Sequence, residues 1–255
     1  MHGELRLSLA TLYGFLIVLA RVSGVIAFVP IPGLRDTPTA SRLLLALALT
    51  FVLLPVWPTP AVEHSSQLLL WGIGELAIGL LIGLTVSMLI EGLELASQMV
   101  GLQAGFSYAS TIDPNTQADS SVLQILIQLF AGMLFFALGF DRQVIQILCR
   151  SFERLPPGRL RFGSEVADTI IHAGSGIFVT GLRLAMPVLA LMLLLDLAIA
   201  VLGRIQAQLQ LIPLSFSLKM LAGLGMLASA LTFFPTVLQS AGARAFTALG
   251  HFLNP

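Results

Sequence analysis

The chain has 255 residues, of which 56% are hydrophobic and 10% are charged, and its mean hydropathy is +0.94. A soluble domain carries roughly 25% charged residues, so this composition excludes an ordinary water-soluble fold and indicates an integral membrane protein built of apolar helices. The formal net charge of +0 offers no basic field to a nucleic acid, and one cysteine and four scattered histidines exclude an internal disulfide and a zinc site.

The first half of the chain contains four apolar runs. Residues 7–29 are long enough for a membrane helix, because about 20 apolar residues cross a hydrocarbon core of ~30 Å. We interpret this run as a retained helix, since Arg21 interrupts it and no clear cleavage site for a signal peptidase follows. Residues 43–57 are too few for a comfortable crossing, whereas residues 68–90 and 122–140 predict two further membrane helices.

A polar stretch separates the third run from the fourth. Residues 91–121 begin as an amphipathic helix and continue, from residue 105 to residue 121, as a stretch rich in Gly, Ser, Thr, Asp and Asn. This stretch contains the turn signal Asp113-Pro114. Its backbone cannot lie unpaired in lipid, so we expect protein or water to surround it.

The second half predicts a helical hairpin. Residues 142–161 are the main basic loop, and residues 170–202 form an apolar run that Pro187 interrupts. A glutamine-rich turn, with Gln206, Gln208 and Gln210, leads to the last apolar stretch, residues 212–253. The predicted fold class is therefore all-α: a polytopic membrane protein of about six apolar helical segments, some short or kinked, ending in a helical hairpin.

The basic residues give conflicting topologies. By the positive-inside rule, Arg35 and Arg42 place the first loop in the cytoplasm, and the basic residues of 142–161 place that segment there too. Three apolar runs lie between the two segments, and three crossings would end on the opposite side. Either residues 91–110 also enter the membrane, or the short runs are not simple crossings.

Five charged residues lie within apolar runs: Arg21, Glu75, Arg183, Asp196 and Lys219. Each costs about 2.5 to 3.5 kcal/mol at the centre of a membrane helix, so each needs a partner. They either line a pore or pair between helices or subunits. Asp196 and Lys219 flank the glutamine-rich turn, which allows a pair across the hairpin.

Two further patterns occur around the third run. Glu91, Glu94 and Gln98 recur at helical spacing and indicate either a solvated helix end or a water-lined lumen. Gly79 and Gly83 have the small-xxx-small spacing that lets another helix backbone approach closely.

The sequence also permits two other classes of function, an intramembrane serine protease and a small-molecule or ion transporter. Ser175, between two glycines, and His251 permit the dyad of an intramembrane serine protease, which Ser175→Ala would test. Small residues at such positions more often pack helices, and no nucleotide-binding loop is present, so we expect no catalytic site and no cofactor. The buried charges permit a small-molecule or ion transporter, but the two halves contain no evident inverted repeat.

Residues 101–109, Gly-Leu-Gln-Ala-Gly-Phe-Ser-Tyr-Ala, followed by Asp113 and Pro114, resemble the R subunit of the flagellar type III export gate, the FliR family. The resemblance runs nearly the full length of the chain. It continues at Pro30 to Gly33, Arg42, Glu75, Gly79, Gly83, Gly139, Ser151, Phe152, Pro156 to Gly158, Gly181, Leu182, Ala185, Pro187, Arg204, Gln208 and Leu209.

The resemblance implies a multi-pass, non-enzymatic subunit of an export gate in the bacterial inner membrane, within the flagellar basal body. Its implied partners are the P and Q subunits of the gate, the B subunit of the export apparatus, the exported flagellar proteins and the lipid bilayer. The family resembles a P subunit fused to a Q subunit, which here predicts a P-like portion, residues 1–165, and a Q-like hairpin, residues 166–255. The equivalent subunit of a virulence injectisome is the alternative within the same architecture.

On the residues alone, residues 105–121 form either a plain surface loop or a channel plug, and the resemblance favours a plug at this position. The residues implied in the plug and its gating are Gly101, Gln103, Gly105, Phe106, Ser107, Tyr108, Asp113 and Pro114.

Overall fold

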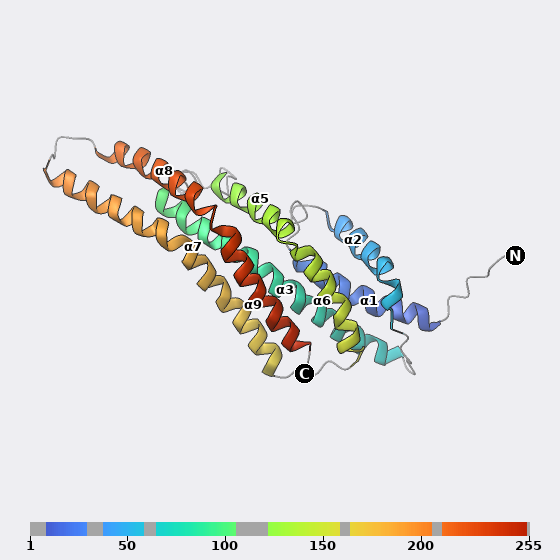
Figure 1. Cartoon of the computed structure of the whole chain (residues 1–255). Helices are drawn as coiled ribbons and strands as arrows, with labels where there is room; N and C mark the ends of the chain where they lie inside the picture. Colours follow the sequence, from blue (N-terminus) through green and yellow to red (C-terminus); the bar gives the residue numbers. More distant parts are fainter. Residues whose placement is uncertain are drawn as a thin grey trace. The chain divides into compact units, whose positions relative to one another are not determined.

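The computed structural model describes residues 9–29, 38–58, 65–105, 122–158, 164–205 and 211–253. Over these ranges the chain is all-helical, as predicted, with eight α-helices and one 3-10 turn (Figure 1). The helices are α1 (Leu9–Phe28), α2 (Thr39–Val52), α3 (Ser65–Ala104), α5 (Val122–Ala137), α6 (Phe140–Arg154), α7 (Ser164–Ile205), α8 (Leu211–Ala230) and α9 (Phe234–Phe252), and the 3-10 turn η1 is Leu54–Val56.

Three of the described helices are long and apolar enough to cross a membrane, over Thr11–Phe28, Gln67–Ala104 and Gly174–Ile205. Two bent pairs, α5 with α6 and α8 with α9, bring the number to five if each pair is one span. The bends are 60° and 56°. Helix α2 is shorter than a crossing requires, in agreement with the expectation for residues 43–57.

Two helices are longer than a single crossing requires. Helix α3 runs for 40 residues and joins residues 91–104 to the third apolar run. Helix α7 runs for 42 residues and contains Pro187. A proline removes only its own hydrogen bond, to the carbonyl four residues earlier, so the apolar sequence on both sides maintains the helix.

The predicted basic loop at residues 142–161 is wrong over most of its length, because α6 occupies Phe140–Arg154. Its buried side chains recur every three or four residues, whereas its arginines lie on the exposed face. The buried residues are Phe140, Val144, Leu148, Ser151 and Phe152, and the exposed arginines are Arg142, Arg150 and Arg154. The charges therefore mark one side of an amphipathic helix.

The chain folds as two compact units. Unit 1 comprises Met1–Met88, Gly139–Ala173 and Gly242–Pro255, and unit 2 comprises Leu89–Leu138 and Gly174–Ala241. The predicted P-like portion, residues 1–165, and Q-like portion, residues 166–255, are defined by resemblance to other subunits and not by compactness. The two units therefore do not test this division, which stays a prediction.

In unit 1, α1 and α3 approach each other at glycines. A Cβ atom on Gly79 would collide with the carbonyl oxygen of Arg21, and one on Gly83 would lie 2.5 Å from the carbonyl oxygen of Val25. On α1, a Cβ atom on Gly24 would lie 2.6 Å from a carbonyl oxygen of α3. The close approach predicted from Gly79 and Gly83 is confirmed.

In unit 2, α3 and α7 meet in the same way. A Cβ atom on Gly181 would lie 3.0 Å from the carbonyl oxygen of Gly92, and one on Gly92 would lie 3.2 Å from the Cβ atom of Thr180. Helices α7 and α8 run side by side as the two arms of the predicted hairpin (Figure 1).

Candidate functional site: two polar clusters among apolar helices

The first polar cluster, in unit 1, is built around Arg21 of α1. The Arg21 side chain is 0% exposed and forms an ion pair with Glu75 of α3, which is 1% exposed. The Nε atom of Arg21 donates a hydrogen bond to Oε2 of Glu75 at 2.6 Å. Two of the five charges that the sequence placed inside apolar runs thus neutralise each other.

Helix α6 and its C-cap residue, Leu155, supply the remaining acceptors for Arg21. Nη1 donates to Oγ of Ser151 at 2.9 Å, and Nη2 donates to the carbonyl oxygen of Leu155 at 2.9 Å. The guanidinium carbon also lies 4.2 Å from the centroid of the Phe152 ring. Each guanidinium nitrogen therefore has an acceptor, and one side chain ties α1, α3 and α6 together. We call this group the Arg21 cluster.

The end of α6 explains why an acceptor is free at Leu155. The last carbonyl groups of a helix have no donor within the helix, so a neighbouring cation can bind them. The chain then turns through Gly158, whose φ of +80° favours glycine. A Cβ atom there would lie 2.5 Å from Cε2 of Trp71, so this turn packs directly on the side of α3 that carries Glu75.

The second polar cluster, in unit 2, is built around Asp196 of α7. Its Oδ1 atom forms an ion pair with Lys219 of α8, which is the pair across the hairpin that the sequence allowed. Its Oδ2 atom accepts a hydrogen bond from Nε2 of Gln103 at 3.2 Å. The two charged side chains are 36% and 21% exposed. The Asp196 cluster thus joins α7, α8 and the last turn of α3.

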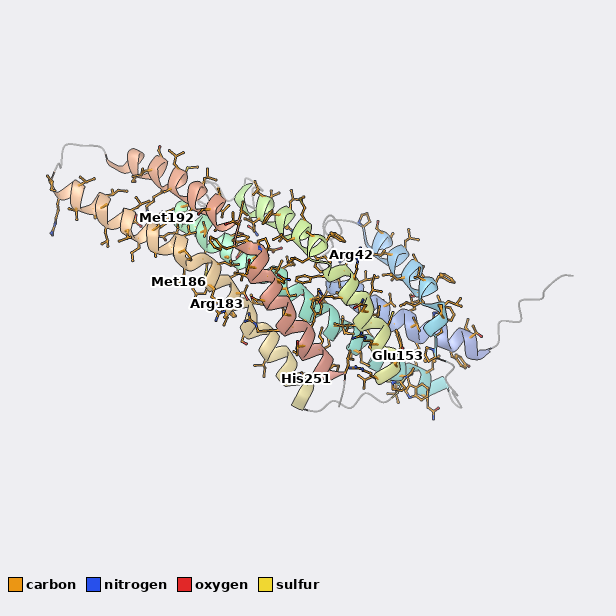
Figure 2. All side chains as sticks on the ribbon, in the orientation of Figure 1. Arg42, Glu153, Arg183, Met186, Met192 and His251 are labelled. Atoms are coloured by element: carbon orange, nitrogen blue, oxygen red, sulfur yellow. The ribbon has the colours of Figure 1, made fainter. Side chains whose placement is uncertain are left out.

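The other charged candidates are Glu91, Glu94 and Arg183, and only Glu94 among them is buried. Glu94 is 8% exposed, Glu91 is partly exposed, and both interact with other groups in the structure. Arg183 differs from the expectation of a buried charge, because its side chain is exposed on α7 (Figure 2). No described residue forms an ion pair with Arg183.

Part of the predicted plug is described. Gly101 is buried in α3, and Gly105 ends that helix with a φ of +86° and donates its N–H to the carbonyl oxygen of Leu102 at 3.2 Å. The other plug residues and the glutamines of the hairpin turn lie outside the described residues: Phe106, Ser107, Tyr108, Asp113, Pro114, Gln206, Gln208 and Gln210.

Sequence reasoning flagged the charges but missed what surrounds Arg21. The sequence predicts a loop at Ser151, Phe152 and Leu155, although their spacing from the apolar residues of α6 is helical. In both clusters the charges are met by opposite charges and neutral hydrogen-bonding groups, which is an arrangement for joining helices. Within the described ranges, no group of three metal-ligating side chains is present.

The sequence matches a known protein family over most of its length. Residues 12–244 match the family described as Bacterial export proteins, family 1. The flagellar biosynthetic protein FliR of Escherichia coli (strain K12) is 32% identical over 212 residues, covering 83% of this chain and 81% of that protein. FliR of Pectobacterium carotovorum is 26% identical, covering 92% and 90% of the two chains, and FliR of Bacillus subtilis is 27% identical, covering 80% and 81%. The chain therefore belongs to the FliR family of bacterial export proteins, non-enzymatic membrane proteins of the flagellar export apparatus.

Proposed function

We propose that this chain helps to form the channel through which unfolded flagellar subunits cross the inner membrane, and that residues 105–121 close this channel at rest. The proposal assigns the energy and the substrate order to other components. It needs a polar segment at membrane depth that can occupy a protein cavity and leave it.

The observation that carries the proposal is the end of α3. An apolar helix, 61% buried over Gln67–Ala104, stops at Gly105, and the Gly/Ser/Thr/Asp/Asn stretch begins there. The polar atoms of Gln103, Asp196 and Lys219 gather at the same end. Irregular, polar backbone is tolerated at membrane depth only where it lines or fills a protein cavity, which supports a plug over a lipid-facing loop.

Within the segment, the residue types suggest separate roles. Phe106 and Tyr108 would supply the bulk that obstructs a lumen, and Asp113-Pro114 would supply a fixed turn. Gly105 already has a left-handed backbone that other residues rarely adopt, so it can redirect the chain sharply at the end of a rigid helix.

The partners we propose are the P and Q subunits, the B subunit and the exported flagellar proteins. Only 22% of the apolar window Gly174–Ile205 in α7 is buried within the chain, against 61% for the window in α3. The α7 surface must meet lipid or equally apolar neighbours. Neighbouring gate subunits would also supply a counter-ion for Arg183, which lipid chains cannot do.

The test is deletion of residues 107–119 in the assembled complex. We expect the complex to assemble, because the deletion removes no member of the Arg21 cluster or the Asp196 cluster, and the membrane to leak ions and small molecules. The matched control replaces the same residues with an equally long Gly/Ser linker, which separates the bulk of the plug from loop length. An assembled deletion variant with wild-type impermeability would return the segment to the status of an ordinary loop.

A further inference from the structure

The last turn of α3 is held in place by very little apolar packing. Ala104 is 0% exposed but contributes only one methyl group, and buried Gly101 contributes no side chain. Leu102, the one large apolar residue of the turn, is 69% exposed. Helices in a membrane associate through van der Waals packing and hydrogen bonds, and this turn has few buried side-chain atoms to pack, so packing alone fixes it weakly.

The specific tie at this turn is the side chain of Gln103. Its amide reaches Oδ2 of Asp196, while Oδ1 of the same carboxylate is bound to Lys219. If the Gln103 bond breaks, Asp196 keeps its counter-ion, so no unpaired charge is left behind. The Asp196 pair is also partly exposed, at 36% and 21%, so a released carboxylate oxygen can find another donor.

The Arg21 cluster has the opposite property. Arg21 and Glu75 are 0% and 1% exposed, and separating them would leave two buried charges unpaired. The contacts of the Arg21 cluster should therefore stay intact. The Asp196 cluster can lose one of its three members without an electrostatic penalty of that kind.

We propose that the hydrogen bond from Gln103 to Asp196 is a latch, which holds the last turn of α3 against the α7–α8 hairpin in the closed gate. The bond breaks during export, while the Asp196–Lys219 ion pair stays intact. This inference rests on the proposed function, because it assigns a regulatory contact to the helix that leads into the closing segment. It makes Gln103 and Asp196 positioning residues, and Gly105 the point about which the chain turns.

The latch is tested by exchanging its two groups. Gln103→Glu places a second carboxylate against Asp196, and Gln103→Met removes the donor with little change in size. The double variant Gln103→Glu with Asp196→Asn restores a carboxylate–amide pair and the original net charge beside Lys219. Gln98→Glu is the matched control, because Gln98 is exposed on the same helix outside the cluster.

The rate of amide hydrogen exchange at residues 101–105 in the assembled complex measures how often the latch opens. A hydrogen bond to a charged group is strong enough that its loss should speed exchange about tenfold or more in Gln103→Glu and Gln103→Met. The double variant should return to the wild-type rate, and Gln98→Glu should not change it. Unchanged exchange in Gln103→Glu, or a double variant as fast as the single one, overturns the latch.

Membrane permeability reads its consequence. Gln103→Glu should raise the resting leak of ions, and the double variant should lower it again. A leaking 107–119 deletion together with an impermeable Gln103→Glu would overturn the latch while leaving the proposed plug intact. A deletion that does not leak would overturn the plug, and hydrogen exchange would still decide whether the latch exists.

Discussion

Arg21 of α1 and Glu75 of α3 lie 54 positions apart in the chain and form an ion pair almost completely removed from solvent. Ser151, Leu155 and Phe152 complete the environment of the guanidinium. An ion transporter would need such charges to be open to the transported ion. Here the guanidinium and the carboxylate are occupied by each other, which favours a structural role.

Removing the carboxylate should therefore destabilise the protein strongly. Breaking a buried pair from one side costs about 3–5 kcal/mol, so Glu75→Ala should lower the melting temperature and the yield of assembled complex. Glu153→Ala is the matched control, because Glu153 is exposed on α6 (Figure 2), and it should change stability by less than about 0.5 kcal/mol.

Glu75→Gln separates structure from proton chemistry. The amide keeps the shape and one acceptor for Arg21, so we expect a smaller loss of stability than in Glu75→Ala and normal export wherever the complex assembles. Export is measured as secreted flagellar protein per assembled complex. A fully assembled Glu75→Gln complex without export would make a proton relay the better interpretation.

The contact between α1 and α3 should not accept a methyl group. Gly79→Ala would drive its Cβ atom into the carbonyl oxygen of Arg21, and overpacking of this kind costs typically about 1–3 kcal/mol. Gly72→Ala on the same helix meets nothing within 4 Å and should be neutral or stabilising by up to about 1 kcal/mol through helix propensity. Thermal unfolding of both variants decides the matter, and equal melting temperatures would contradict the close approach.

Arg183 should matter only in the assembly. Because its side chain is exposed in the isolated chain, Arg183→Met should leave the melting temperature of the purified chain nearly unchanged, within about 0.5 kcal/mol in stability. In the complex, loss of the cation should reduce co-purification of the neighbouring subunits. Undiminished co-purification would mean that lipid phosphate, and not a partner's carboxylate, meets this arginine.

The chain should be more stable with its partners than alone. Binding of a partner to the folded state stabilises it by mass action, and the exposed apolar surface of α7 gives such a partner a large area to cover. Co-expression with P-like and Q-like subunits should raise the melting temperature in detergent. A monodisperse, thermally stable monomer with no gain from co-expression would contradict this expectation.

Much of the fold was predictable, because apolar runs and turn residues are local signals. The hairpin is the clearest case: Asp196 and Lys219 lie at similar distances from the turn between α7 and α8, so the sequence allowed the pairing that the structure shows. Gly79 and Gly83 likewise carried the signal of a close helix contact in their spacing.

The missed features are non-local or were masked by a stronger local signal. Nothing near Arg21 in the sequence identifies Glu75 or the end of α6 as its partners, since packing of three helices brings them together. The arginines of α6 are typical of a loop, and they mask the helical spacing of its buried side chains. Pro187 suggested a break, but a single missing hydrogen bond does not end a 42-residue helix.

The length of α3 sets a condition on how the protein is made. Its 40 residues span about 60 Å, twice the ~30 Å of hydrocarbon, and even a tilt of about 40° leaves roughly 15 Å of rise outside the core. Lipid can cover only part of this apolar helix, which agrees with the 61% of the window Gln67–Ala104 that is buried within the chain itself. The part of α3 that exceeds the hydrocarbon must be covered by protein, so folding of the rest of the chain around α3 is coupled to the insertion of this helix into the membrane.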